Sequence, residues 1–131
     1  MQRVIVNGTF DILHTGHLDL LKFAKSRGDH LLVCIDTDAR VRELKGSSRP
    51  INSQEDRRYM LESLKYVDEV RFFDSDQSLV DIIKEYQPAI MVKGSDYKGK
   101  TIVGQEYIPE MLYYERTKHS TTKTIQDIIS R

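Results

Sequence analysis

Residues 4–17 read VIVNGTFDILHTGH. The β-branched run Val4 to Val6 is typical of a short buried strand, and Asn7-Gly8 is typical of the turn that ends one. After His17, apolar residues recur at roughly helical spacing as far as Arg27-Gly28. The stretch therefore predicts a strand, a glycine turn and a helix, which is a building unit of α/β folds.

The same alternation continues along the rest of the chain. Apolar runs bounded by turn residues predict strands, and apolar residues at helical spacing predict helices between them. Because strands that alternate with helices form mostly parallel sheets, we expect an α/β fold, a single Rossmann-like domain over residues 1–131 with a mostly parallel five-stranded sheet and helices on both faces. The other predicted strands are 31–35, 70–73, 89–92 and 111–114, and the other predicted helices are 53–66, 79–86 and 122–129.

A polar stretch from Arg40 to Asn52 separates two of these elements. Its glycine, serine and proline residues are typical of a loop. It also carries four cations, so we expect a mobile lid over an anionic substrate, with an ordinary connection as the alternative. The cations are Arg40, Arg42, Lys45 and Arg49.

The composition excludes some partners. Lys plus Arg (20) balance Asp plus Glu (20), so no overall field attracts nucleic acid or an anionic membrane. Cys34 lies in an apolar run, which predicts a buried, inert thiol, and a lone cysteine fits a reducing compartment. No stretch approaches the length of a membrane span. We expect a cytoplasmic protein that binds neither nucleic acid nor membrane.

The ends of the predicted strands indicate where a ligand binds. In parallel α/β sheets the ligand lies beyond the carboxyl ends of the strands, where Asn7-Gly8, Asp36 to Asp38 and Lys93 to Asp96 are expected. The turn after Gly8 leads into a helix whose free N–H groups and positive dipole end favour phosphate. The turn lacks the P-loop spacing and the three-glycine dinucleotide fingerprint, so a kinase or a dehydrogenase is not supported.

Two histidines stand where that helix begins. His14 and His17 are three residues apart and can face the same side. Imidazoles so placed can donate hydrogen bonds to phosphoryl oxygens and stabilise the charge that develops during displacement at phosphorus. A metal pair and ordinary surface residues are the alternatives. Zinc would need a third ligand and an intervening glutamate, which Thr15-Gly16 does not supply, so we expect no protein-ligated metal.

The whole segment resembles a known signature. Gly8-Thr9-Phe10-Asp11-x-x-His14-x-Gly16-His17 is similar to the GTFDxxHxGH motif of the cytidylyltransferase-like nucleotidyltransferases, with the same spacing throughout. The resemblance implies an enzyme that moves NMP from an NTP to a phosphorylated sugar or polyol and releases pyrophosphate. It implies catalytic roles for His14 and His17, and nucleotide binding by Gly8, Thr9, Phe10 and Gly16.

Later segments extend the resemblance over nearly the whole chain. Lys45 falls where the family has a basic residue on the α-phosphate, which makes it the third catalytic candidate. Gly94, Asp96 and Tyr97 resemble the family's nucleotide-binding turn, and Ser120, Thr121 and Thr122 match a closing motif that holds phosphate. This closing motif is one residue shorter than in family members and lacks their glycine, which leaves the roles of Arg116 and Thr117 open.

Four residues are candidates for binding the acceptor: Asp11, Asp38, Arg57 and Arg116. Arg57 falls in the helix where the family has a substrate-binding arginine, although a solvated charge on a polar helix face is the alternative. Asp11 can instead cap the turn that follows it.

The resemblance also implies a cation and a partner subunit. Family members use a divalent cation, usually Mg²⁺, held mainly by the triphosphate, and this ion keeps several waters and needs few protein ligands. The acceptor's own phosphate oxygen is the nucleophile, so no general base is required. The partners implied are an NTP, a phosphorylated small-molecule acceptor and a second copy of the chain, as a homodimer.

Two subfamilies compete for the substrate. The chain length and the motif around the histidines suit glycerol-3-phosphate cytidylyltransferase, which makes CDP-glycerol. Residues 44–52 and 92–98 look more like the nucleotidyltransferase domain of the ADP-heptose synthases, which adenylylate a heptose 1-phosphate, and we favour this interpretation. A non-catalytic nucleotide-binding module is the alternative from another class, and the presence of His14, His17 and Lys45 argues against it.

Overall fold

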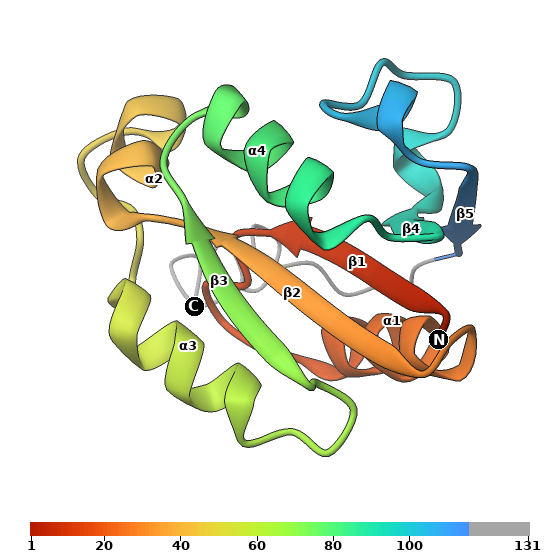
Figure 1. The fold of residues 1–131 in the computed structure, drawn as a ribbon. Helices are drawn as coiled ribbons and strands as arrows, with labels where there is room; N and C mark the ends of the chain where they lie inside the picture. The colour runs from red at the N-terminus through yellow and green to blue at the C-terminus, as the bar shows by residue number, and fades with distance from the viewer. Residues whose placement is uncertain (116–131) are drawn as a thin grey trace.

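The computed structural model describes residues 1–115, which form one parallel sheet between layers of helices (Figure 1). All four pairs of neighbouring strands are parallel. This confirms the predicted α/β, Rossmann-like fold, while the extension of one domain over residues 1–131 stays a prediction and the helix expected at 122–129 lies outside the described residues. The strands are β1 (Arg3–Gly8), β2 (His30–Asp36), β3 (Glu69–Phe73), β4 (Ile90–Gly94) and β5 (Glu110–Tyr114), in the spatial order β3-β2-β1-β4-β5.

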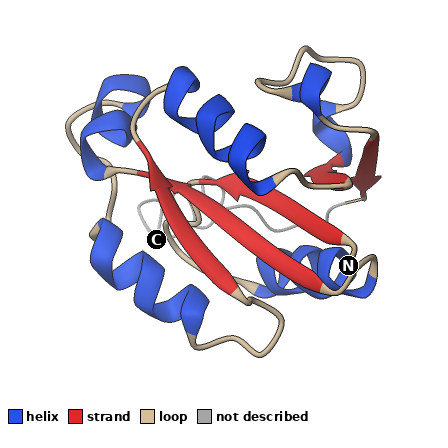
Figure 2. Ribbon diagram, in the orientation of Figure 1, coloured by secondary structure: helices blue, strands red, loops and turns tan. Residues whose placement is uncertain are grey.

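The helices cover both faces of the sheet (Figure 2). Parallel neighbours need a crossover connection, and these helices supply it. Helices α1 and α3 pack on one face, and α4 packs on the other with α2 beside it. Their bounds are α1 (Thr15–Ser26), α2 (Asp38–Lys45), α3 (Gln54–Glu62) and α4 (Asp76–Tyr86), followed by the short 3-10 helices η1 (Ser95–Tyr97) and η2 (Gln105–Tyr107).

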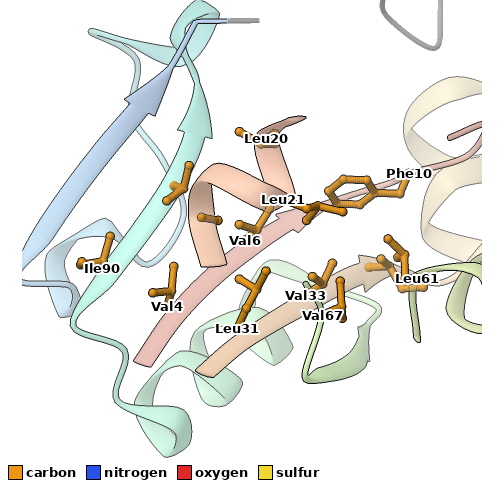
Figure 3. Close-up of a cluster of buried hydrophobic side chains, with 13 residues drawn as sticks. Val4, Val6, Phe10, Leu20, Leu21, Leu31, Val33, Leu61, Val67 and Ile90 are labelled. Carbon is orange, nitrogen blue, oxygen red and sulfur yellow. The ribbon is translucent and has the colours of Figure 1, made fainter. Parts of the chain in front are cut away.

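Alternation along the strands divides the core into two clusters. In β1, Val4 and Val6 join the cluster under α1 and α3 that Figure 3 shows, whereas Ile5 joins the cluster under α4. The same period of two directs three polar strand-end residues to the α4 face of the sheet. These residues are Asn7, Asp36 and Lys93, whose neighbours two positions earlier are Ile5, Cys34 and Met91 of the α4 cluster.

Cys34 lies inside this second cluster. It is fully buried, and burial raises the pKa of its thiol to about 12. The expectation of an inert thiol is therefore supported, because the reactive thiolate is scarce near neutral pH. Within residues 1–115, no helix combines the length and the apolar character that crossing a membrane requires.

The structure corrects the loop predicted over residues 40–52. The first half of this segment belongs to α2, which is capped by the Thr37 hydroxyl as it accepts a hydrogen bond from Arg40 N–H at 3.3 Å. Val41 is the buried residue of this helix. A single buried apolar side chain among charged residues gives no helical periodicity of apolar residues, so the sequence pattern did not indicate the helix. The irregular segment begins only at Gly46, whose φ of +99° favours glycine.

Gly104 offers a test of the packing beside α4. Its φ is +82°, and an added Cβ would lie 2.3 Å from the Cδ1 atom of the buried Ile83. Gly99 is a matched control, because its φ is +84° but an added Cβ would meet nothing within 4 Å. We expect Gly99→Ala to lower the free energy of unfolding by about 1–2 kcal/mol through backbone strain. Gly104→Ala should lower it by roughly 1–3 kcal/mol more through overpacking.

Urea unfolding of both variants beside the wild type measures this difference. Equal losses in the two variants would contradict the close approach between Gly104 and Ile83.

Candidate active site

A pocket of about 470 Å³ opens at the carboxyl ends of β1, β2 and β4. Its lining crosses the edge of the sheet, from Leu20 of α1 on one face to Leu79 of α4 on the other. The turn after β1, the end of α2 and residues 101–103 complete its walls. The pocket therefore lies where the sequence predicted it, at the ligand-binding edge of a parallel sheet.

The turn after β1 sets both histidines at the start of α1. His14 is the N-cap, and its Nδ1 accepts a hydrogen bond from Gly16 N–H at 3.0 Å. The Nδ1 of His17 in turn accepts one from His14 N–H at 3.3 Å. A neutral imidazole whose Nδ1 accepts carries its proton on Nε2. Each ring can therefore offer an Nε2–H donor.

The two rings have different relations to the pocket. They stack with their centroids 3.9 Å apart, but only His17, which is 5% exposed, lines the pocket. Phe10 packs 5.2 Å from the His17 ring. The structure thus brings His17 together with Gly8, Thr9 and Phe10 as predicted, whereas His14 lies outside the lining and its catalytic role stays a prediction.

Lys45 reaches the same turn from the end of α2. Its Nζ donates to the Thr9 hydroxyl at 3.2 Å, and both residues line the pocket. Partial burial lowers the pKa of Lys45, and the nearby positive charge of Arg49 lowers it further, while Asp36 and Asp11 oppose this. The predicted catalytic lysine therefore lies at the turn after β1 (residues 9–14), which is the predicted phosphate turn, beside a second cation.

Asp11 does not cap the turn that follows it. Its buried carboxylate accepts hydrogen bonds from Ile51 N–H and Asn52 N–H, each at 2.8 Å for the closer oxygen, and from Arg49 Nε at 3.3 Å. Asn52 Nδ2 also donates to Asp11 O at 2.6 Å. Asp11 thus ties the phosphate turn to residues 49–52, and its acceptor-binding role stays a prediction.

Arg57 is fully buried and bound to protein oxygens. Its guanidinium donates to Thr9 O at 3.0 Å, to Asp36 O at 2.8 Å and to Asp38 Oδ1 at 2.8 Å, and its Nε donates to Asn52 O at 3.1 Å. Neither Arg57 nor Asp38 is among the residues that line the pocket. The solvated-charge alternative for Arg57 is wrong. The predicted substrate-binding role of the pair is untested, and this geometry favours a structural one.

The turn after β4 contributes Gly94 and Tyr97 to the pocket, and Asp96 lies outside its lining. Lys93 was expected at the ligand edge, with an ordinary strand-end lysine as the alternative. It is 8% exposed and lines the pocket, with its Nζ 4.2 Å from the Tyr97 ring centroid. The strand period places Lys93 on the α4 face, opposite to Val92. The alternation of side chains along the strand was therefore the signal in the sequence that indicated which face Lys93 occupies.

Four more charged residues of the lining were not among the predicted catalytic or binding residues, although Arg40 and Arg49 were expected as cations of a lid: Asp36, Arg40, Arg49 and Asp76. Asp36 ends β2, and burial raises the pKa of its carboxyl while Arg40 lowers it. Arg40 lies 3.9 Å from Asp36 and donates to Asp76 at 2.5 Å. Asp36 and Arg40 are four residues apart, whereas Asp76 comes from the start of α4, so no local spacing links Asp76 to the other two.

Several predicted residues cannot be placed. Arg116, Thr117, Ser120, Thr121 and Thr122 lie outside the described residues, and their roles remain predictions. Among residues 1–115, no group of three or more His, Cys, Asp or Glu side chains is arranged to hold a metal ion.

Comparisons with known proteins agree with this architecture. A family model described as cytidylyltransferase-like matches residues 5–126. Curated proteins named bifunctional protein HldE are 46% identical over 122 residues in Campylobacter fetus subsp. fetus and 47% identical over 126 residues in Sulfurimonas denitrificans. These alignments cover 93% and 95% of this chain but 26% of each relative, so the chain spans about a quarter of their length.

A solved structure is also similar over most of its length. The lipopolysaccharide core biosynthesis protein from Thermoplasma volcanium GSS1 superimposes with a TM-score of 0.74 at 27% identity. The match covers 90% of this chain and 99% of that protein. The two folds therefore agree over most of both chains.

Replacement of Arg57 tests its structural role. We expect Arg57→Ala to lower the free energy of unfolding by about 3–5 kcal/mol, because it removes a buried cation and leaves buried carbonyl oxygens without donors. The neighbouring Arg58 is a matched control, since its side chain is 42% exposed, forms ion pairs with Glu55 and Glu62 on its own helix, and lies over the Phe72 ring with its Cζ 5.2 Å from the centroid. Arg58→Ala should change stability by no more than about 1 kcal/mol.

Chemical denaturation measures both variants. A stable Arg57→Ala protein with weakened substrate binding would instead favour the ligand role expected from the sequence.

Proposed function

The chain belongs to the cytidylyltransferase-like family, and from this premise we propose that it transfers a nucleotidyl group from a nucleoside triphosphate to a phosphorylated small molecule. One observation carries the proposal. His17 near the N-terminus of α1 shares a pocket with Thr9 and Lys45, so an imidazole donor and an ammonium group face one space at the positive end of the helix dipole. Such a space is suited to a polyphosphate.

The reaction needs little covalent help from the protein. An oxygen of the acceptor's phosphate forms a bond to the α-phosphorus of the triphosphate, and the bond from that phosphorus to the pyrophosphate oxygen breaks. The attacking oxygen is already ionised near neutral pH, so no proton has to be removed. Lys45 and the Nε2–H of His17 would stabilise the charge that moves onto the α-phosphate and the departing pyrophosphate.

Mg²⁺ fits this chemistry as a companion of the triphosphate. Of the carboxylates that line the pocket, Asp11 is engaged by residues 49–52, Asp36 lies beside Arg40, and Asp76 forms an ion pair with Arg40. Mg²⁺ keeps several waters and needs only one or two protein carboxylates. We therefore assign the ion mainly to the phosphates, where it would neutralise charge, and the protein's cations to positioning those phosphates.

For the substrates we favour ATP and a heptose 1-phosphate. The resemblance of residues 44–52 and 92–98 to ADP-heptose synthases supports this choice, and these segments supply Lys45, Arg49, Lys93 and Tyr97 to the pocket. The curated relatives, and the name of the Thermoplasma volcanium protein as one of lipopolysaccharide core biosynthesis, support an envelope sugar. CTP with glycerol 3-phosphate is the second candidate, and a nucleotide-binding module without turnover is the third.

We further propose that the protein works as a cytoplasmic homodimer. The family resemblance supports the dimer, and three large apolar side chains are exposed on α2, on α3 and on the segment that joins them: Leu44, Tyr59 and Ile51. A lone buried cysteine supports a reducing compartment. Light scattering on the purified protein would measure its mass in solution.

Pyrophosphate release tests the reaction. The purified protein, with Mg²⁺, is given each of ATP, CTP, GTP and UTP with each of heptose 1-phosphate, glycerol 3-phosphate, phosphocholine and phosphoethanolamine. We expect release with ATP and heptose 1-phosphate. Release only with CTP and glycerol 3-phosphate would move the protein to the other subfamily, and nucleotide binding without release from any pair would favour the non-catalytic module.

Replacement of His17 tests the mechanism. We expect His17→Ala to keep the fold and the binding of MgATP while turnover falls by about a hundredfold or more, as the loss of a transition-state donor predicts. Lys22→Ala is the control, because Lys22 is an exposed residue of the same helix and does not line the pocket. Unchanged turnover in His17→Ala would refute the role given to this imidazole.

A further inference from the structure

Arg49 has a donor that the described part of the chain leaves unused. Its Nη2 atom is buried and has no hydrogen-bond partner among residues 1–115, although the Nε of the same guanidinium donates to Asp11. Arg49 lines the pocket, and its side chain is 14% exposed. A buried charged donor without an acceptor is costly and rare in folded proteins, so the atom indicates a missing partner.

The Arg49 guanidinium is held in place by the Asp11 carboxylate. Its partner Asp11 has a fully buried side chain, and the Asp11 carboxylate is itself fixed by two main-chain donors, Ile51 N–H and Asn52 N–H. These contacts form between segments some 40 positions apart in the sequence. The fork of a planar guanidinium held at one edge is preorganised to present its other edge.

The charges around Arg49 favour an anion as the missing partner. Lys45, which bonds to Thr9 at the phosphate turn, is close enough that burial and then the charge of Arg49 lower the pKa of its ammonium group. An anion that contacts both cations would relieve this repulsion. The other pocket guanidinium, on Arg40, also has a buried donor without a hydrogen-bond partner among residues 1–115, its Nε, but that atom lies 3.9 Å from the Asp36 carboxylate and its Nη2 donates to Asp76.

We propose that Arg49 binds a phosphoryl oxygen of a substrate through Nη2, and that Asp11 is the positioning residue that aims it. This inference rests on the proposed function for the identity of the ligands, a triphosphate and a phosphorylated acceptor. Either could supply the oxygen, because both present ionised phosphoryl groups that match an arginine fork. The assignment moves Asp11 from a candidate acceptor ligand to a residue that acts through Arg49.

Calorimetric titration tests the proposal without turnover. MgATP and heptose 1-phosphate are each titrated into the wild type, Arg49→Ala and Arg49→Lys. Loss of a charged hydrogen bond predicts an increase of about ten- to a hundredfold in the dissociation constant of one ligand for Arg49→Ala. The dissociation constant of Arg49→Lys should lie between those of the wild type and Arg49→Ala, because lysine keeps the charge but lacks the planar guanidinium fork. The ligand whose affinity falls identifies the source of the phosphoryl group.

Arg27→Ala is the matched control. Arg27 is an exposed arginine at the C-cap of α1, so the variant loses the same charge far from the phosphate end of that helix. Its affinities should stay within about twofold of the wild type. Circular dichroism and thermal melting show whether each variant is folded, and Arg49→Lys keeps the test usable if Arg49→Ala is not.

A double-mutant cycle separates positioning by Asp11 from general support of the fold. We expect Asp11→Asn to weaken binding of the same ligand as Arg49→Ala, and to add little in the double variant, because both changes disable one contact. Additive losses would overturn the role given to Asp11.

The outcomes distinguish this proposal from the reaction itself. Wild-type affinities for both ligands in Arg49→Ala would overturn the role of Arg49 even if the wild type releases pyrophosphate. Weakened binding in Arg49→Ala would uphold that role even if no acceptor supports release, in which case the proposed reaction fails alone.

Discussion

A buried arginine joins the parts of the chain that form the pocket. Arg57 of α3 donates to Thr9 O in the phosphate turn, to Asp36 O at the end of β2 and to the Asp38 carboxylate at the start of α2. The Thr9 carbonyl lies just beyond β1 and the Asp36 carbonyl belongs to the last residue of β2, where the backbone needs other partners. One fully buried cation therefore defines how the β1 turn, α2 and α3 meet. Asp11 adds a further link, because it binds residues 49–52.

The phosphate turn is held by these contacts of Arg57 and Asp11 and by hydrogen bonds within the turn itself. The reciprocal contacts between His14 and His17 leave both Nδ1 atoms as acceptors, so the backbone sets the tautomer that makes each Nε2 a donor. The chain as a whole is neutral, yet His17, Lys45, Arg49 and Lys93 converge on one pocket. Local concentration of donors, and not a global field, is what suits the site to phosphates.

Much of this arrangement was predictable from local sequence patterns. Particular residues show which features those patterns could not predict. The strand, turn and helix around Gly8 to His17 were predictable because spacing and turn chemistry act within a few residues. Helix α2 was missed because Val41 is its one buried side chain. Arg57 was weighed as a solvated charge or a ligand, since no pattern reveals that carbonyl groups 21 and 48 positions away will surround it. Asp36 and Lys93 were expected at the ligand edge from their places at strand ends, but their presence in one pocket required the strands to align.

The sequence by itself determined the alternation of strands and helices, the phosphate turn at the start of α1, the inert cysteine and the family resemblance. These features rest on short-range sterics, on periodic burial and on spacing within one segment. The tertiary structure alone decided which charges face the pocket and which serve the fold. It buried Arg57 among carbonyl oxygens and paired Asp11 with Arg49. The physical reason is that the cost of burying a charge depends on partners from distant segments, which become neighbours only when the sheet has formed.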